Sequence, residues 1–279
     1  MNPYLELMRI GNCVMTAIAV LIGFLVSVTF TVGLASINAL GFVGIIIAMV
    51  SAFFICAGGQ AINDVYDSVI DKKINPKKPI PSKRIKKSTA LHFSQLLFII
   101  GVLLATTLGT MSFLIALVFA FLLIIYSSVL YKKKYYGNII VALGTAITFV
   151  FGASITGMIP LIIIFFALSA FFINMSREVT KDFEDLKKDK GFKVTLPMLK
   201  KKGAKLLVVF YYEIGVLFAL AAYIVFNLSY AYLLLVLIAI IVFYYAILNL
   251  HKNSFKQSQK KSKKGMLLSL LAYISTIIK

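Results

Sequence analysis

Residues 63–71 read N-D-V-Y-D-S-V-I-D and directly follow an uncharged run that begins at Ile10. One membrane-spanning helix needs about 20 apolar residues. The run is therefore long enough for two helices joined by a tight hairpin. It is too long for a signal peptide, and its second half follows without a cleavage-like break. The acids of residues 63–71 are thus expected where a membrane helix meets water.

Four further uncharged runs follow this one along the chain. They are Ser88–Tyr131, Tyr135–Ser176, Leu206–Leu250 (interrupted only by Glu213) and the shorter Gly265–Ile278. Each long run holds two helices, with turn-forming residues near its midpoint, at 33–44, 109, 152–160 and 227–229. We predict helices near 11–33, 41–63, 89–109, 112–131, 138–155, 159–180, 206–226, 230–250 and 265–278. The last is short and marginal for a full span.

The composition supports an all-α, multi-pass membrane protein. Apolar residues make up 61% of the 279 and charged residues 14%, whereas a soluble domain has roughly 45–50% and about 25%. These values exclude an ordinary soluble domain and a disordered chain. Cys13 and Cys56 both lie in apolar runs, which excludes a disulfide framework. We expect one domain, residues 1–279, with nine transmembrane helices around a central lipid-binding cavity.

The basic residues define the expected topology. The net charge is +19, and nearly all Lys and Arg follow the second, fourth, sixth and eighth predicted helices. Because cytoplasmic loops are rich in Lys and Arg, we place these loops and the amino terminus in the cytoplasm. The carboxyl terminus lies outside if the last helix spans. We therefore predict a cell-membrane protein, in contact with membrane lipids, with no nucleic-acid partner. The lysines of residues 252–264 are interpreted as topology-setting charge.

The acids are concentrated in two short segments. All ten except Glu6 and Glu213 follow the second helix or end the sixth. Asp64, Asp67 and Asp71 stand at i, i+3 and i+7, and the same spacing recurs in residues 182–189. On an α-helix such positions share one face, so each segment presents a column of like charges. A cation is expected beside each column, and carboxylate oxygens suit Mg²⁺.

Two such columns facing one another would hold two Mg²⁺ ions and a polyanion between them. Mg²⁺ normally binds a few carboxylates together with substrate phosphate oxygens, and an apolar cavity beneath would accept a hydrocarbon chain. The predicted substrate is therefore a diphosphate with a long apolar chain, and metals would assist the ionisation of such an allylic diphosphate. The columns also suggest two copies of a four-helix unit, although we see no residue-level repeat beyond the Asp spacing.

At these motifs the sequence resembles the UbiA superfamily of intramembrane prenyltransferases. The family's N-D-x-x-D-x-x-x-D matches residues 63–71, and its D-x-x-D-x-x-x-D matches residues 182–189. Its R-x-x-N appears at residues 9–12, its P-x-P-S at 79–82 and its Gly-Asn at 137–138. The resemblance covers essentially the whole chain and includes the nine-helix count.

The resemblance implies roles for individual residues. Asn63, Asp67 and Asp71 would bind one Mg²⁺ ion, and Asp185 and Asp189 a second. Asp64 and Asp182 are catalytic candidates, either supporting the metal ligands or acting as general base. The candidates for substrate binding are Arg9, Asn12, Lys72, Arg84, Lys132, Arg177, Glu178 and Lys181.

Within the superfamily, residues 177–185 and the Thr-Leu-Pro at 195–197 resemble a group of archaeal ether-lipid enzymes. These transfer a geranylgeranyl group to a glycerol hydroxyl of a phosphate-bearing lipid. Residues 83 and 188 are Lys where that group usually has Gly. Three alternatives stay open: an aromatic acceptor, as in quinone or haem synthesis; an ion-coupled transporter that uses Asp relays; and a CDP-alcohol phosphotransferase. The transporter expects isolated acids at mid-membrane, and the phosphotransferase expects an Asp-Gly and Ala-Arg pattern that is absent around Asp64.

Overall fold

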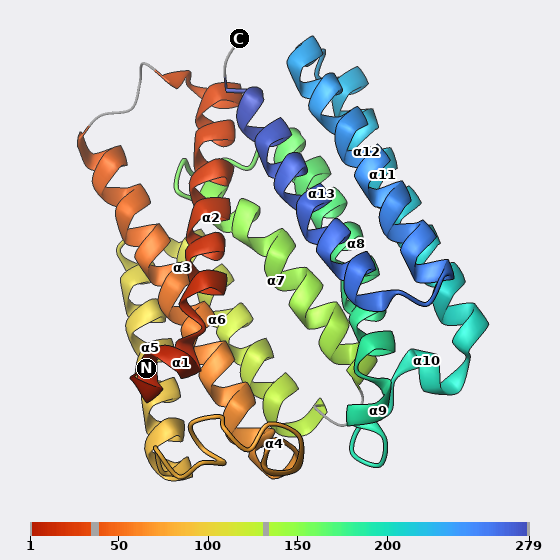
Figure 1. Ribbon diagram of the computed structural model, residues 1–279. Helices are drawn as coiled ribbons and strands as arrows, with labels where there is room; N and C mark the ends of the chain where they lie inside the picture. Colours follow the sequence, from red (N-terminus) through yellow and green to blue (C-terminus); the bar gives the residue numbers. More distant parts are fainter. Residues whose placement is uncertain (1, 35–38, 131–133, 278–279) are drawn as a thin grey trace.

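The computed structural model describes residues 2–34, 39–130 and 134–277, and its described secondary structure is helical (Figure 1). The nine long helices are α2 (Ile10–Thr31), α3 (Ala39–Tyr66), α5 (Lys87–Thr106), α6 (Thr110–Ile125), α7 (Lys134–Ser154), α8 (Leu161–Glu184), α11 (Lys201–Val225), α12 (Tyr230–His251) and α13 (Phe255–Ser275). The short elements are α1 (Pro3–Met8), α4 (Ser68–Ile74), the π-helical turn η2 (Tyr126–Leu130), α9 (Leu186–Asp189) and α10 (Leu196–Leu199). The nine long helices correspond one to one with the nine predicted from the sequence.

Among the residues that the structure describes, eight helices are long and apolar enough to cross a membrane. They are all of the long helices listed above except α13. The protein is therefore a multi-pass membrane protein. The ninth, α13, begins at Phe255, ten residues before the predicted start. The basic segment expected to be a loop is helical because Lys and Gln are good helix formers and because its Ser258 hydroxyl donates to the Ala246 carbonyl of α12 at 2.8 Å.

The hairpin turns fall where the sequence predicted them. Gly33, Gly109, Gly157 and Asn227 each have a positive φ, between 47° and 103°. Gly adopts this conformation without steric cost, and Asn tolerates it better than most residues. Each of these residues lies between two long antiparallel helices and allows the chain to reverse within a few residues.

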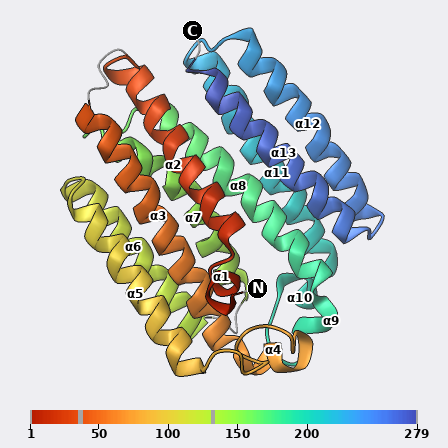
Figure 2. The same cartoon turned by 60° about the vertical axis from the view of Figure 1, so that its left-hand side comes forward.

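The long helices are arranged so that α2, α3, α7 and α8 lie between two flanking groups. Figure 2 shows α5 and α6 on one side and α11, α12 and α13 on the other. Glycines allow the central helices to approach closely: a β-carbon on Gly23 of α2 would overlap the Phe149 carbonyl of α7, and one on Gly152 of α7 would overlap the Val20 carbonyl of α2. Small residues serve this purpose in membrane helix packing.

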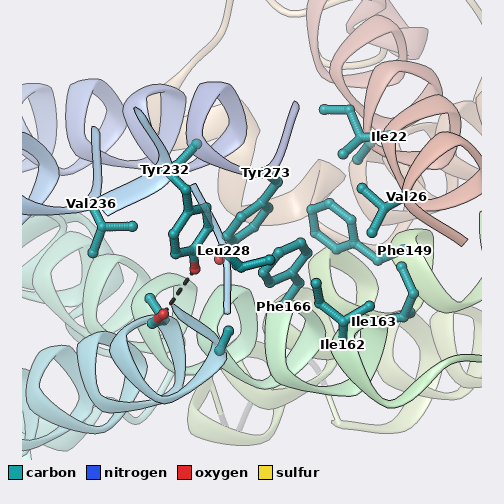
Figure 3. Close-up of a cluster of buried hydrophobic side chains, with 14 of the residues drawn as sticks. Ile22, Val26, Phe149, Ile162, Ile163, Phe166, Leu228, Tyr232, Val236 and Tyr273 are labelled. Atoms are coloured by element: carbon teal, nitrogen blue, oxygen red, sulfur yellow. Dashed lines mark hydrogen bonds between the residues drawn. The ribbon is translucent and has the colours of Figure 1, made fainter. Parts of the chain in front are cut away.

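A cluster of buried hydrophobic side chains, four of them aromatic, joins α2, α7, α8, α11, α12 and α13 (Figure 3). Phe166 of α8 stacks on Tyr273 of α13 with ring centroids 4.0 Å apart, and the Tyr232 hydroxyl donates to the Ala219 carbonyl at 2.8 Å. Stacked rings and the hydrogen-bonded Tyr232 hydroxyl hold these helices together. Tyr273 and Phe149 also line the cavity described next, so the cluster closes its apolar end.

Candidate active site

A cavity of about 840 Å³ lies between the central helices and α13. Its apolar part is lined by side chains such as Ile115, Phe119, Phe149 and Leu270, and its polar end by both Asp motifs. A site of this kind suits a ligand with one charged head and a long apolar chain, because each part meets a matching surface.

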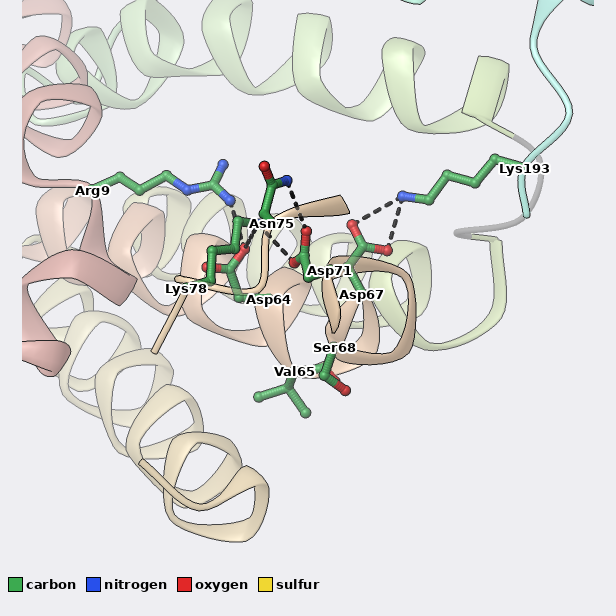
Figure 4. Close-up of polar contacts among 9 residues, drawn as sticks. All are labelled: Arg9, Asp64, Val65, Asp67, Ser68, Asp71, Asn75, Lys78 and Lys193. Atoms are coloured by element: carbon green, nitrogen blue, oxygen red, sulfur yellow. Dashed lines mark hydrogen bonds and ion pairs between the residues drawn. The ribbon is translucent and has the colours of Figure 1, made fainter. Parts of the chain in front are cut away.

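The first Asp motif begins in α3 and continues into α4 (Figure 4). The helix breaks at Asp67, yet the backbone hydrogen bonds continue across the break: Asp67 N–H donates to the Asn63 carbonyl at 2.9 Å, and Asp71 N–H to the Asp67 carbonyl at 2.8 Å. Asn63, Asp67 and Asp71 therefore stay on one side, and all three line the cavity. The i, i+3, i+7 spacing predicted that Asp64 would share this face, but Asp64 does not line the cavity and Asn63 takes its place there.

The second Asp motif repeats this construction at the end of α8. Asp185 lies between α8 and α9, and Asp189 ends α9. The Asp185 N–H donates to the Lys181 carbonyl and the Asp189 N–H to the Asp185 carbonyl, both at 2.9 Å. Asp185 and Asp189 line the same cavity as the first motif. The two motifs thus face one space, as the sequence predicted.

The first acid of each motif is buried behind the cavity wall. Asp64 is 4% exposed and accepts from Arg9 at 2.6 Å and from Lys78 at 3.0 Å. Asp182 is fully buried and accepts from the Asn138 amide at 2.8 Å. Neither is among the residues lining the cavity. This placement favours a supporting role, in which each acid orients its helix end, over direct contact with an acceptor hydroxyl.

Two lysines that sequence reasoning did not single out hold the acids of the first motif. Lys78 Nζ lies 2.7 Å from Asp71 Oδ2, and Lys193 Nζ lies 2.8 Å from Asp67 Oδ1. Figure 4 shows Lys193 reaching the first motif from the segment that follows the second. Lys78 directly precedes the P-x-P-S stretch, which was a weak signal. Lys193 is one of ten basic residues in its region, and nothing in its pattern marks it.

Most of the predicted substrate-binding residues line the cavity. They are Arg9, Asn12, Arg177, Glu178 and Lys181. The Arg177 guanidinium contacts the Glu178 carboxylate at 2.6 Å.

Two of the remaining predictions lie outside the cavity lining. Lys72 is exposed, and Arg84 bonds Glu6 at 2.8 Å and the Lys77 carbonyl at 2.7 Å. Lys132 lies outside the described residues.

The chemistry of the lining fits a hard divalent cation. The Asn63 amide oxygen is buried and has no hydrogen-bond partner, and it lies on the same wall as the carboxylates of Asp67 and Asp71. Carboxylate and amide oxygens are ligands that Mg²⁺ accepts. In the described part of the chain no three acids, His or Cys gather closely enough to form a metal centre by themselves. The ammonium groups of Lys78 and Lys193 instead supply the positive charge that the first column requires.

The sequence matches the model of the UbiA prenyltransferase family over residues 14–271. The chain therefore belongs to the UbiA prenyltransferase family, a class of membrane enzymes whose predicted motifs and helices it carries.

Within this family, the chain is similar over its full length to enzymes with one particular name. It is 34% identical over 276 residues to the digeranylgeranylglyceryl phosphate synthase of Methanococcus aeolicus, covering 97% of this chain and 96% of that one. It is 35% identical over 288 residues to the synthase of the same name from Methanopyrus kandleri, covering 100% of both.

Solved structures share the fold of this chain. A structure from work on the digeranylgeranylglyceryl phosphate synthase in membranes superposes with a TM-score of 0.81 at 32% identity, covering 99% of this chain and 98% of that one. A UbiA homolog from Archaeoglobus fulgidus, bound to DMAPP and Mg²⁺, shares the fold with a TM-score of 0.71 at 18% identity, covering 95% of this chain and 98% of that one.

Proposed function

We propose that this protein transfers a geranylgeranyl group from geranylgeranyl diphosphate to the free hydroxyl of geranylgeranylglyceryl phosphate, which yields digeranylgeranylglyceryl phosphate. The observation that carries the proposal is full-length similarity to synthases of that product, joined to a cavity with two Asp motifs at one end and apolar walls at the other. The names of the relatives favour this acceptor over an aromatic ring, and the clustering of acids at one end of the helices argues against a transporter.

The donor is proposed to bind with its diphosphate between the two motifs. Asn63, Asp67 and Asp71 would hold one Mg²⁺ ion, and Asp185 and Asp189 a second. When bound, Mg²⁺ neutralises the negative charge that develops on the departing diphosphate.

The basic side chains at this end of the cavity add to that effect. Arg9, Lys181 and Lys193 lie where they can bind phosphate oxygens, and Lys78 can exchange its carboxylate partners for them. Asp64 and Asp182 hold the helix ends from behind.

The apolar walls of the cavity have a separate role in the reaction. They bury the prenyl group and exclude water, which would otherwise capture an allylic cation-like species. The acceptor hydroxyl then attacks the former allylic C1 as the bond to the diphosphate breaks. The hydroxyl proton must pass to a base within hydrogen-bond reach.

The polar end of the cavity is proposed to face the cytoplasm, because the basic segments are concentrated there and Lys-rich and Arg-rich loops stay inside. A cysteine introduced at residue 86, in a variant with Cys13 and Cys56 replaced by Ala, should react with an impermeant reagent only from the cytoplasmic side. One introduced at residue 227 should react only from outside. The reverse labelling would invert the topology.

The activity is tested with purified protein in detergent or vesicles. Geranylgeranyl diphosphate and Mg²⁺ are supplied with geranylgeranylglyceryl phosphate or with an aromatic acceptor, and the product is identified by mass. We expect the ether lipid, and no product when Mg²⁺ is chelated. A ring-prenylated product without ether lipid would refute the acceptor while leaving the prenyltransferase assignment intact.

A further inference from the structure

Lys263 is a cavity-lining cation that belongs to no motif. It lies on α13, far from both Asp segments in the sequence, and it is exposed at the cavity edge. The other basic side chains lining the cavity each contact a carboxylate; they are Arg9, Lys78, Arg177, Lys181 and Lys193. Within residues 2–34, 39–130 and 134–277, Lys263 is the lining cation for which no carboxylate partner is found. Its charge is therefore available to a ligand.

The backbone beneath Lys263 is held in place. Gln259, one helical turn earlier on the same face of α13, is 7% exposed and donates its amide to the Arg177 carbonyl of α8 at 3.2 Å. Between them, the buried Ser262 hydroxyl bonds the Tyr212 hydroxyl of α11. The α-carbon of Lys263 is thus fixed relative to α8, while its ammonium group is free.

Arg177 adds a second donor to this part of the cavity. Its Nη1 contacts Glu178 and Asn174, but its Nε is buried and has no hydrogen-bond partner. A buried donor without a partner is costly. An anion near Lys263 would satisfy this donor as well.

The surroundings of Lys263 suit a lipid with a charged head. Met15 of α2 and Leu267 of α13 line the cavity and are 43% and 51% exposed. Leu267 lies one helical turn after Lys263 on the same face of α13, so apolar surface adjoins the ammonium group. An amphipathic molecule could place its chain against the apolar side chains and its anionic group against the ammonium.

We propose that Lys263, with Arg177, binds the phosphate group of the prenyl acceptor. The inference rests on the proposed function, which requires a second anionic group besides the donor diphosphate. The Asp motifs, with their metals and lysines, provide for the diphosphate. Lys263 provides a separate positive charge, and a charge-assisted contact to phosphate is stronger than a neutral hydrogen bond. Lys263 is thus a residue that determines acceptor specificity.

The test compares Lys263→Gln with Lys264→Gln, because Lys264 is its exposed neighbour and does not line the cavity. Steady-state kinetics are measured with geranylgeranylglyceryl phosphate varied at saturating donor, and with donor varied at saturating acceptor. We expect Lys263→Gln to raise the acceptor KM by about tenfold or more, which is the usual effect of losing a charged contact. The donor KM should stay within about twofold of the wild-type value. Lys264→Gln should leave both constants unchanged, and Lys263→Arg should restore most of the acceptor KM.

A second arm uses geranylgeranylglycerol, which lacks the phosphate. Wild type and Lys263→Gln should use this alcohol with the same KM, since the lost contact is absent from both. An equal KM defect with the alcohol would overturn the proposal, as would a rise in donor KM alone or no change in either constant. If wild-type protein makes no ether lipid from either acceptor, the proposed function fails first and this inference falls with it; an active wild type with an unaffected variant refutes only the inference.

Discussion

The two Asp motifs have the same backbone geometry but different support. In the first half of the molecule, the leading acid Asp64 is held by two cations, Arg9 and Lys78. In the second half, the leading acid Asp182 accepts from a neutral amide, that of Asn138. At the corresponding place, the first motif therefore has a charged donor, Arg9, and the second has a neutral donor, Asn138. The same scaffold can thus present two leading acids whose matching donors differ in charge.

The packing shows that the halves are two copies of one unit. Gly101 of α5 packs against the Ser51 carbonyl of α3, and Gly215 of α11 packs against the Ser169 carbonyl of α8. Ser51 precedes Asp64 by the same thirteen residues as Ser169 precedes Asp182. The central helices α2 and α7 also carry equivalent residues.

One sequence offset relates Val20 to Phe149 and Gly23 to Gly152, the residues of the reciprocal α2–α7 contact. The same offset relates Arg9 to Asn138. Arg9 and Asn138 are therefore equivalent positions with different residues, and this pair accounts for the different charge of the matching donors. Lys78 is a further cation on Asp64 from outside this correspondence.

The largest effect is expected where the halves agree. Asp67→Ala and Asp185→Ala each remove the acid at the helix break of one motif, and each should lower the turnover number by about a thousandfold or more, because the charge on the leaving group is no longer compensated. Turnover is measured by product mass at saturating substrates. Glu184→Ala, an exposed position on α8, should retain activity. Full turnover in either Asp variant would show that one motif suffices.

Sequence reasoning predicted the nine long helices, the four hairpin turns and the single cavity that both Asp motifs line. It succeeded there because uncharged runs, glycines and regular Asp spacing are local patterns. It also placed Asp64 and Asp182 on the cavity face, but neither lines the cavity. It did not predict that residues 255–264 are helical, since the serines and Gln259 that attach this segment to its neighbours are spread among lysines. Lys193 was missed for a related reason: its contact with Asp67 joins positions far apart in the sequence and depends on how the halves assemble.

The Asp spacing suggested the repeat, but its other equivalent positions escaped detection for a physical reason. Its equivalent positions are small residues, Ser51 with Ser169 and Gly101 with Gly215, which are common in any membrane helix. Such residues become informative only when the structure shows what each one contacts.

The second prediction exploits the difference between the leading acids. Asn138→Asp would remove the amide that donates to the fully buried Asp182 and place a second carboxylate beside it. Losing the donor of a buried charge and adding a like charge should cost about 3–5 kcal/mol. Arg9→Gln removes one of two cations from Asp64 and leaves Lys78, so its cost should be about 1–2 kcal/mol. Unfolding is followed by thermal melting in detergent. Equal melting temperatures of the two variants would mean that the donors on Asp64 and Asp182 contribute equally to stability.

The third prediction tests whether the halves are equivalent in packing. An added β-carbon on Gly101 would lie 2.6 Å from Ile55 Cγ1, and one on Gly215 would lie 2.6 Å from Ile173 Cγ1. Both Gly→Ala variants should therefore lose a similar amount of stability, about 1–3 kcal/mol for an overpacked contact. Gly11→Ala is the matched control, because nothing lies within 4 Å of the added carbon. Unequal melting of the Gly101 and Gly215 variants would limit the symmetry to the Asp motifs.

The smallest effect concerns the segments that follow the two motifs. After the first motif, Arg84 pairs with Glu6 at 2.8 Å, and the two side chains are 38% and 29% exposed. After the second, Lys193 is 8% exposed and contacts Asp67 inside the cavity. An exposed ion pair contributes about 0–1 kcal/mol, so Arg84→Ala should change the donor KM by less than about twofold.

Lys72→Ala should behave in the same way, since Lys72 is exposed and does not line the cavity. Lys193→Ala provides the contrast: it removes a cation from the place where the diphosphate is proposed to bind, and the donor KM should rise by about tenfold. All three constants are measured in one assay with donor varied at saturating acceptor. A large rise in donor KM in Arg84→Ala would show that Arg84 takes part in substrate binding, as the family resemblance implied. It would also mean that the segment after the first motif moves toward the cavity when the donor binds.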